Sequence, residues 1–186
     1  MEAIKKIELN KIAKVILMAV LGTLLLTISA KIKIPFYPVP MTMQTFVVLF
    51  LGITLGPKIG LLTVSLYLFE GIFGLPVFAG TPEKGIGLVY FTGPTMGYLI
   101  GFLVAVYFAG SFKYDKGSIN TFLKLIFSVS FIYILGLIWL GTLIGWDKPI
   151  FKLGAEPFLL AELFKMLLLL FLIPTLSKAK KLIKIT

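Results

Sequence analysis

Long runs of apolar residues, separated by short polar segments, make up most of the chain. A helix that spans a bilayer needs about 20 predominantly apolar residues, and about six runs approach that length. They cover about residues 12–30, 41–55, 58–73, 93–110, 121–145 and 157–176. The pattern predicts an all-α integral membrane protein with six transmembrane helices.

Only Gly56 and Pro57 separate the second run from the third, so the pattern predicts a very tight connection between two helices. Proline is tolerated at the start of a helix because the amide donor that it lacks is unpaired there anyway. The same Gly-Pro-x-x-Gly pattern occurs at residues 56–60 and 93–97. We interpret it as helix-start chemistry combined with close helix packing through small residues.

Composition agrees with a membrane protein. The 186 residues are 59% hydrophobic and 14% charged, with a mean hydropathy of +1.04, whereas soluble domains are nearer half apolar and about a quarter charged. The longest loop that tolerates polar residues, roughly residues 80–90, is too short for a separate soluble domain. We therefore expect one membrane domain over residues 1–186.

The distribution of lysine predicts the orientation. All 18 basic residues are lysines and the net charge is +10, but they cluster in short loops, which fits the positive-inside rule better than nucleic-acid binding. With a cytoplasmic N-terminus, twelve lysines lie inside and five outside. The inner set is Lys5, Lys6, Lys11, Lys14, Lys58, Lys113, Lys116, Lys124, Lys178, Lys180, Lys181 and Lys184; the outer set is Lys31, Lys33, Lys84, Lys148 and Lys152. Both termini are thus predicted to be cytoplasmic.

Several kinds of chemistry are excluded by what the chain lacks. It contains no cysteine and no histidine, which removes disulfides, thiolate metal sites and the commonest general base and metal ligand. We expect no metal and no cofactor. No Gly-x-x-x-x-Gly-Lys-Ser/Thr loop is present, so the chain is not expected to hydrolyse ATP by itself. Energy for uphill transport would have to enter through partner subunits.

Glu162 and Lys165 lie inside the last apolar run. Ionisable groups at membrane depth are costly and by default mark functional sites, and a three-residue spacing places both on one helix face. The alternative is a private salt bridge that reaches the interface. A carboxylate beside the lysine favours the charged ammonium, which favours ligand binding over catalysis. In the predicted orientation this pair lies near the outer surface, beneath loops 31–40, 74–92 and 146–156.

Other residues are candidates for the same site or for a partner surface. Aromatic side chains before the fourth run are either pocket walls or an interfacial belt; these are Phe78, Tyr90, Phe91 and Tyr98. Gln44, early in the second run, either caps loop backbone or faces the edge of the pocket. Small residues on the first run allow another helix to approach, either within the fold or from a second membrane subunit; these are Ala19, Gly22, Thr23 and Thr27.

Four segments of the chain resemble the BioY family, the biotin-specific S components of energy-coupling factor (ECF) transporters. They are Val39-Pro-Met-Thr-Met-Gln-Thr45, Leu55-Gly-Pro-Lys-Ile-Gly60, Gly74-Leu-Pro-Val-Phe-Ala-Gly80 and Thr92-Gly-Pro-Thr-Met-Gly-Tyr98. The resemblance runs in order from about residue 35 to 170. It implies an S-component bundle of six helices in a bacterial or archaeal cell membrane.

The resemblance also implies a ligand and partners. The ligand is biotin, and the partners are a transmembrane T subunit and two cytoplasmic ABC ATPases. The Asp-x-x-Lys pair on the last helix of the family corresponds to Glu162 and Lys165, with glutamate in place of aspartate. The loop at Phe78, Ala79 and Gly80 is expected to line the pocket. The first-helix Ala-x-x-x-Ala motif, which docks the T subunit, is matched in part by Ala19 and Thr23.

Two other functions are weighed beside a biotin uptake subunit. A passive facilitator or channel for a small amphiphilic solute would need a continuous polar path across the membrane. An intramembrane enzyme would use Glu162 and Lys165 as an acid–base pair, which the lack of histidine, cysteine and a metal cluster argues against. We expect a transport protein and no enzyme.

Overall fold

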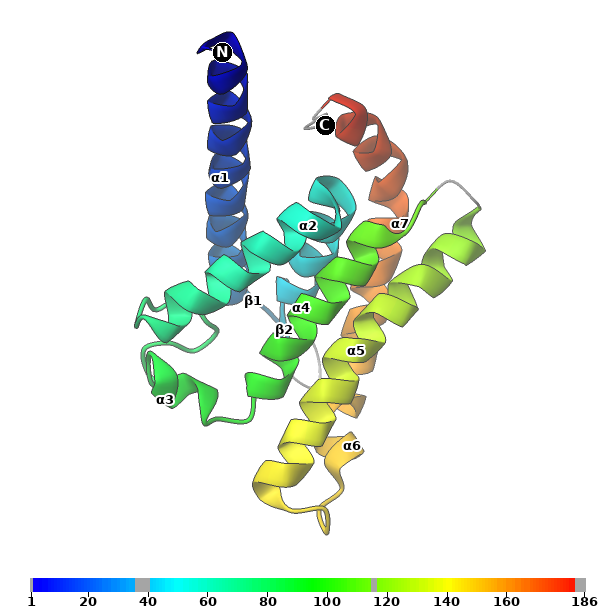
Figure 1. Ribbon diagram of the computed structural model, residues 1–186. Coiled ribbons are helices and arrows are strands. Elements are labelled where there is room, and N and C mark those ends of the chain that lie inside the picture. The colour runs from blue at the N-terminus through cyan, green and yellow to red at the C-terminus, as the bar shows by residue number, and fades with distance from the viewer. Residues whose placement is uncertain (1, 36–40, 115–116, 183–186) are drawn as a thin grey trace.

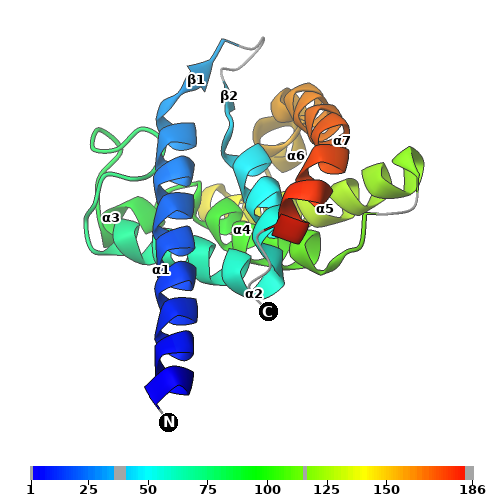
Figure 2. The same ribbon diagram turned by 90° about the horizontal axis from the view of Figure 1, so that it is seen from above.

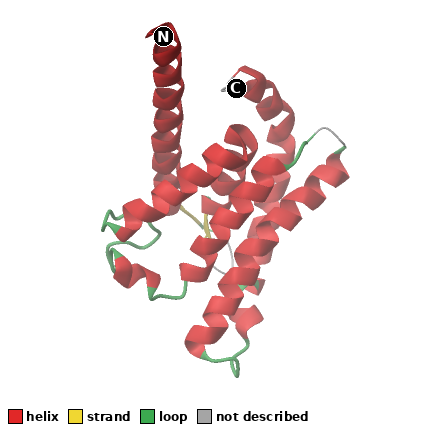
Figure 3. Ribbon diagram, in the orientation of Figure 1, coloured by secondary structure: helices red, strands yellow, loops and turns green. Residues whose placement is uncertain are grey.

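The computed structural model describes the backbone of residues 2–35, 41–114 and 117–182, and the side chains of residues 11–35, 41–114 and 117–176 (Figure 1). Most of the described residues are helical, and two short strands lie between the first two long helices (Figure 3). The helices are α1 (Glu2–Lys31), α2 (Gln44–Ile72), α3 (Leu88–Phe91), α4 (Met96–Ser111), α5 (Ser118–Ile144), α6 (Ile150–Gly154), the 3-10 helix η1 (Glu156–Phe158) and α7 (Leu159–Leu182). The strands are β1 (Lys33–Ile34) and β2 (Met41–Thr42), which pair antiparallel.

The prediction of six membrane helices is confirmed within the described residues. Four segments are long and apolar enough to cross a bilayer, namely Lys11–Lys31, Gln44–Ile72, Ser118–Ile144 and Ile150–Leu176, and the shorter α4 is also apolar. The sixth helix comes from α2, which is broken at Gly56, where φ is 80° and ψ is 174°. A positive φ of this size suits glycine, and Pro57 then begins the second half.

The two halves of α2 fold back onto each other through small residues. A Cβ built on Gly60 would lie 3.3 Å from Cα of Gly52, so the two backbones are almost in contact there. Glycine on the facing helix continues this pattern, since a Cβ on Gly110 would meet the backbone of Pro57. Small residues permit such approaches between membrane helices. The tight connection predicted at residues 56–57 thus becomes a hairpin of helices that packs on α4.

The first helix contacts the rest of the protein along one narrow stripe. Ala19 and Thr23 are each 2% exposed, and Gly22 faces Thr63 of α2 so closely that it leaves no room for a side chain. The stripe therefore packs within the fold, which was one of the two alternatives left open by the sequence. The prediction that Ala19, Gly22 and Thr23 dock a partner stays a prediction.

Both ends of the described chain lie at one end of the molecule (Figures 1 and 2). The start of α1 and the end of α7 are there. The prediction that this end is cytoplasmic stays a prediction. In Figure 1, α3 and α6 lie at the opposite end, and in Figure 2 the β1–β2 hairpin lies on the side opposite the N-terminus. The hairpin, α6 and η1 were not expected from the sequence, and the Pro-rich residues 36–40 of the first expected lid lie outside the described residues.

Candidate functional site

A cavity of about 400 Å³ lies between the helices. Residues from the start of α2, the start of α4, the second half of α5, α6 and the start of α7 line it, together with β2 and the loop after α2. This volume falls in the usual range for small-molecule pockets. The lining residues are Met41, Thr42, Gln44, Thr45, Ala79, Pro94, Thr95, Tyr98, Phe102, Ile132, Tyr133, Leu140, Leu153, Gly154, Phe158, Glu162 and Lys165.

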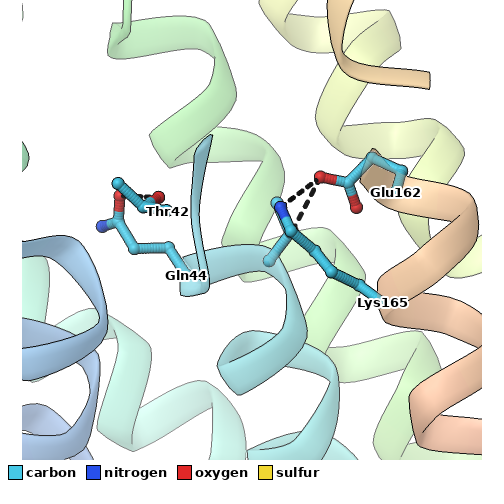
Figure 4. Close-up of polar contacts among 5 residues, drawn as sticks. Thr42, Gln44, Glu162 and Lys165 are labelled. Atoms are coloured by element: carbon cyan, nitrogen blue, oxygen red, sulfur yellow. Dashed lines mark hydrogen bonds and ion pairs between the residues drawn. The ribbon is translucent and has the colours of Figure 1, made fainter. Parts of the chain in front are cut away.

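Glu162 and Lys165 form an ion pair in the wall of this cavity (Figure 4). Nζ of Lys165 lies 2.8 Å from Oε1 of Glu162, and each residue is only 4% exposed. They lie on successive turns of α7, as the three-residue spacing predicts. Two opposite charges in the wall of a cavity are therefore almost completely buried within the protein.

Thr45, in the first turn of α2, completes a closed set of three hydrogen bonds with this pair. Its hydroxyl donates to Oε1 of Glu162 at 2.8 Å and accepts from Nζ of Lys165 at 2.9 Å. The second carboxylate oxygen, Oε2, is buried and has no hydrogen-bond partner among the described residues. An unsatisfied buried carboxylate oxygen costs free energy. Because Glu162 also lines the cavity, its carboxylate is the candidate acceptor for an N–H or O–H donor of a ligand.

Aromatic side chains form much of the remaining wall. The rings of Tyr98 and Tyr133 meet edge to face with centroids 6.1 Å apart, and Tyr133 lies next to the Glu162 carboxylate. The Tyr98 hydroxyl donates to the carbonyl of Gly154 at 2.8 Å, which joins α4 to α6. Flat apolar walls with a few polar groups suit a compact ligand that contains a ring.

Gln44 both lines the cavity and supports the loop after α2. Its side-chain amide donates to the hydroxyl of Tyr67 at 2.9 Å, and that hydroxyl donates to the carbonyl of Val77 at 3.0 Å. Tyr67 is fully buried. The chain of hydrogen bonds fixes the start of the loop that brings Ala79 to the cavity.

This chain of hydrogen bonds gives a first prediction about stability. Tyr67→Phe removes one hydroxyl and leaves both the Val77 carbonyl and the Gln44 amide unsatisfied, so we expect a loss of about 2 kcal/mol. Thermal unfolding in detergent, followed by circular dichroism, measures the change. Tyr107→Phe is the matched control, because Tyr107 is 47% exposed on α4. Equal melting temperatures for the two variants would contradict the prediction.

The structure brings five of the eight residues named from the sequence to the cavity, which are Gln44, Ala79, Tyr98, Glu162 and Lys165. The other three, Phe78, Gly80 and Tyr90, are not among its described lining residues. Phe78 is 1% exposed and stacks on Tyr90 at a centroid distance of 4.8 Å. The hydroxyl of Tyr90 donates to the Ala79 carbonyl at 2.9 Å, and burial raises the pKa of Tyr90 above its ordinary value. These residues support the cavity wall from behind.

Sequence reasoning missed several lining residues, of which Thr45 and Tyr133 touch the charged pair most directly. Each is a polar group inside an apolar run, and that was the available signal. The sequence did not show that they face Glu162, because they lie on α2 and α5, far from α7 in the chain. The described residues hold no group of three acidic, histidine or cysteine side chains that would suit a metal ion.

Comparison with known proteins finds the same family along nearly the whole chain. The model of the BioY family matches residues 3–182. A probable biotin transporter BioY of Pyrococcus horikoshii is 35% identical over 153 residues, which cover 82% of this chain and 90% of that protein. The biotin transporter BioY of Thermotoga maritima is 36% identical over 145 residues, covering 77% of this chain and 84% of the relative.

A solved structure agrees in three dimensions. The crystal structure of the S-component for biotin from an ECF-type ABC transporter superimposes with a TM-score of 0.73 at 26% sequence identity. The alignment covers 91% of this chain and 93% of that chain. The resemblance noted in four sequence segments therefore extends to the whole described bundle. The family model, the sequence identities and the shared fold agree, and they show that the chain belongs to the BioY family.

Proposed function

We propose that the chain is the biotin-binding and membrane-translocating subunit of a vitamin uptake transporter. The observation that carries the proposal is the buried pair of Glu162 and Lys165 in the wall of a 400 Å³ cavity, with Oε2 of Glu162 unpaired. The family membership, the named relatives and the biotin S-component structure support it. This is a transport role, and biotin is the cargo rather than a cofactor.

The chemistry of biotin suits the cavity. Its ureido ring offers two N–H donors and a carbonyl, and the carboxylate of Glu162 is an acceptor while the ammonium of Lys165 is a donor. Glu162 lines the cavity, so its carboxylate is the acceptor that an N–H group of the ring needs. The apolar bicycle and tail would contact walls such as Tyr98, Phe102 and Phe158. The pair thus recognises a polar ring, and the walls hold the apolar remainder.

The partners and the orientation are part of the proposal. We expect a T subunit and two ABC ATPases to drive translocation in a bacterial or archaeal cell membrane. The similarity to the ECF S-component structure supports this expectation. The lysine distribution supports a cytoplasmic location for both termini. The short helix α6, which lines the cavity, lies at the opposite end in Figure 1, so the cavity would then open outward.

A passive facilitator is disfavoured by the packing beyond the cavity. The hydrophobic core includes Leu125, Met166 and Leu169, which are 0%, 8% and 0% exposed. A facilitator would need a continuous polar path through this core. Ligand flux into liposomes that contain this chain without any ATPase would favour the facilitator instead.

The direct test is biotin binding to the purified protein. We expect one biotin per chain, measured by isothermal titration calorimetry in detergent after any co-purified ligand has been identified by mass spectrometry and removed. Pantothenate, a vitamin acid that lacks the ureido ring, is the control ligand and should not compete. The proposal fails if the folded protein neither retains nor binds biotin.

A further inference from the structure

The loop over residues 77–81 forms part of the cavity wall without any regular secondary structure. Ala79 lines the cavity, and its neighbours Val77, Phe78 and Thr81 are 8%, 1% and 6% exposed. A buried loop has backbone carbonyls that no helix or sheet satisfies, so each of them needs another donor. How this loop is held therefore determines how firmly one side of the cavity is closed.

Side chains from three helices supply those donors. Tyr67 of α2 donates to the carbonyl of Val77, and Tyr90 of α3 donates to the carbonyl of Ala79. Lys31 of α1 supplies the rest: its Nζ lies 3.1 Å from the Phe78 carbonyl, 2.7 Å from the Thr81 carbonyl and 2.8 Å from the Thr81 hydroxyl. An ammonium has three N–H donors, and this loop provides an acceptor for each.

Lys31 is well placed for this contact. It lies in the last turn of α1, where a positive charge interacts favourably with the helix dipole. No residue of α1 is among the described lining of the cavity, so Lys31 acts on the cavity only through the loop. The Thr81 hydroxyl also donates to the Phe78 carbonyl at 2.7 Å. Without Lys31, the Thr81 carbonyl would lose the side-chain donor that the structure gives it.

We propose that Lys31 is a positioning residue of the binding cavity, whose ammonium ties α1 to the 77–81 loop and thereby slows ligand release. This inference rests on the proposed function only in taking biotin as the ligand. Lys31 touches the loop carbonyls and not the cavity, and it holds Ala79 in the wall. Removing it lets the buried carbonyls turn toward water, which opens the wall beside the ligand.

The test is the dissociation rate of biotin from Lys31→Met, measured by chasing radiolabelled biotin from the protein in detergent. Because hydrogen bonds to a charged group are lost, we expect release to be about tenfold faster than from the unchanged chain. Lys33→Met is the matched control, since Lys33 is exposed and only two residues further along the chain; its release rate should not change. An unchanged rate for Lys31→Met, while the unchanged chain binds biotin, overturns the inference. Absence of binding to the unchanged chain overturns the proposed function instead.

A second variant approaches the same contact from the loop. Thr81→Val removes the hydroxyl that accepts from Lys31 and should also speed release. In the double variant Lys31→Met/Thr81→Val, the increase in the release rate should be smaller than the product of the two single increases. Both substitutions remove the same contact, so their effects should not be independent. If the increase in the release rate of the double variant equals the product of the two single increases, the inference is overturned. The Thr81 variant also keeps the test open if Lys31→Met does not fold.

Two further readouts separate positioning from other roles. Hydrogen exchange of the ligand-free protein should be faster over residues 77–81 in Lys31→Met but not in Lys33→Met, and unchanged exchange would overturn the inference. Biotin amide, whose tail carries no charge, should be released faster by the same factor as biotin. If Lys31→Met speeds the release of biotin but not of biotin amide, Lys31 contacts the ligand carboxylate directly and the positioning role is wrong.

Discussion

Lys165→Met is expected to weaken biotin binding by roughly 2–5 kcal/mol, the usual cost of truncating one partner of a buried, hydrogen-bonded charge pair. The variant removes the donor to a ligand carbonyl and leaves the buried carboxylate of Glu162, 4% exposed, with the hydroxyl of Thr45 as its hydrogen-bond donor. A stranded buried charge also destabilises the fold by about 3–5 kcal/mol. Calorimetry and thermal unfolding in detergent measure the two effects separately.

A double variant distinguishes lost binding from lost folding. Glu162→Gln/Lys165→Met removes both charges, so no uncompensated carboxylate remains and most of the stability should return. Biotin affinity should stay low, because the carboxylate acceptor and the ammonium donor are both absent. Lys152→Met is the control, since Lys152 is an exposed lysine on the nearby α6. If both Glu162→Gln and Lys165→Met bind as tightly as the unchanged chain, the pair is not the site.

Gly97→Val is expected to destabilise the protein by about 3 kcal/mol and to damage the cavity as well. A Cβ at residue 97 would lie 2.5 Å from Cβ of Trp139 and would collide with the carbonyl of Leu135. Backbone atoms on α5 cannot yield as a flexible side chain does, so α4 and α5 must separate. Tyr98 on α4 and Tyr133 on α5 both line the cavity, and their edge-to-face contact would be lost.

Ser111→Val provides the matched control on the same helix, because Ser111 is exposed at the end of α4. We expect the melting temperature in detergent and the biotin affinity to fall together for Gly97→Val and to stay near the original values for Ser111→Val. A Gly97→Val protein that melts like the unchanged chain would show that the two helices do not need this approach.

The helical architecture could be predicted from the chain because its signals are local. Hydrophobic length locates spans without knowledge of their neighbours, and Gly56 followed by Pro57 marks a break through its own backbone preferences. Elements that depend on contacts between segments were missed. The β1–β2 pair needs Lys33 to meet Thr42, and α6 and η1 are too short for a periodic signal.

Some residues of the candidate site could likewise be predicted from local signals in the sequence, and others could not. Residue type alone showed that Glu162 and Lys165 are costly in a membrane and share one helix face. Only the tertiary structure decided that Thr45 and Tyr133 face the pair, that Oε2 of Glu162 lacks a partner, and that Phe78 and Tyr90 lie behind the wall. It also decided that the stripe at Ala19 and Thr23 packs on α2.

The physical reason is the range of each effect. Transfer of an apolar run into lipid and the spacing of charges along a helix are properties of neighbouring residues, so the sequence by itself determined the membrane class, the six helices and the charged pair. A cavity exists only between elements, and its shape depends on how closely glycines such as Gly97 and Gly60 let the helices approach. Which side chains face the ligand, and which only support them, was therefore decided by packing.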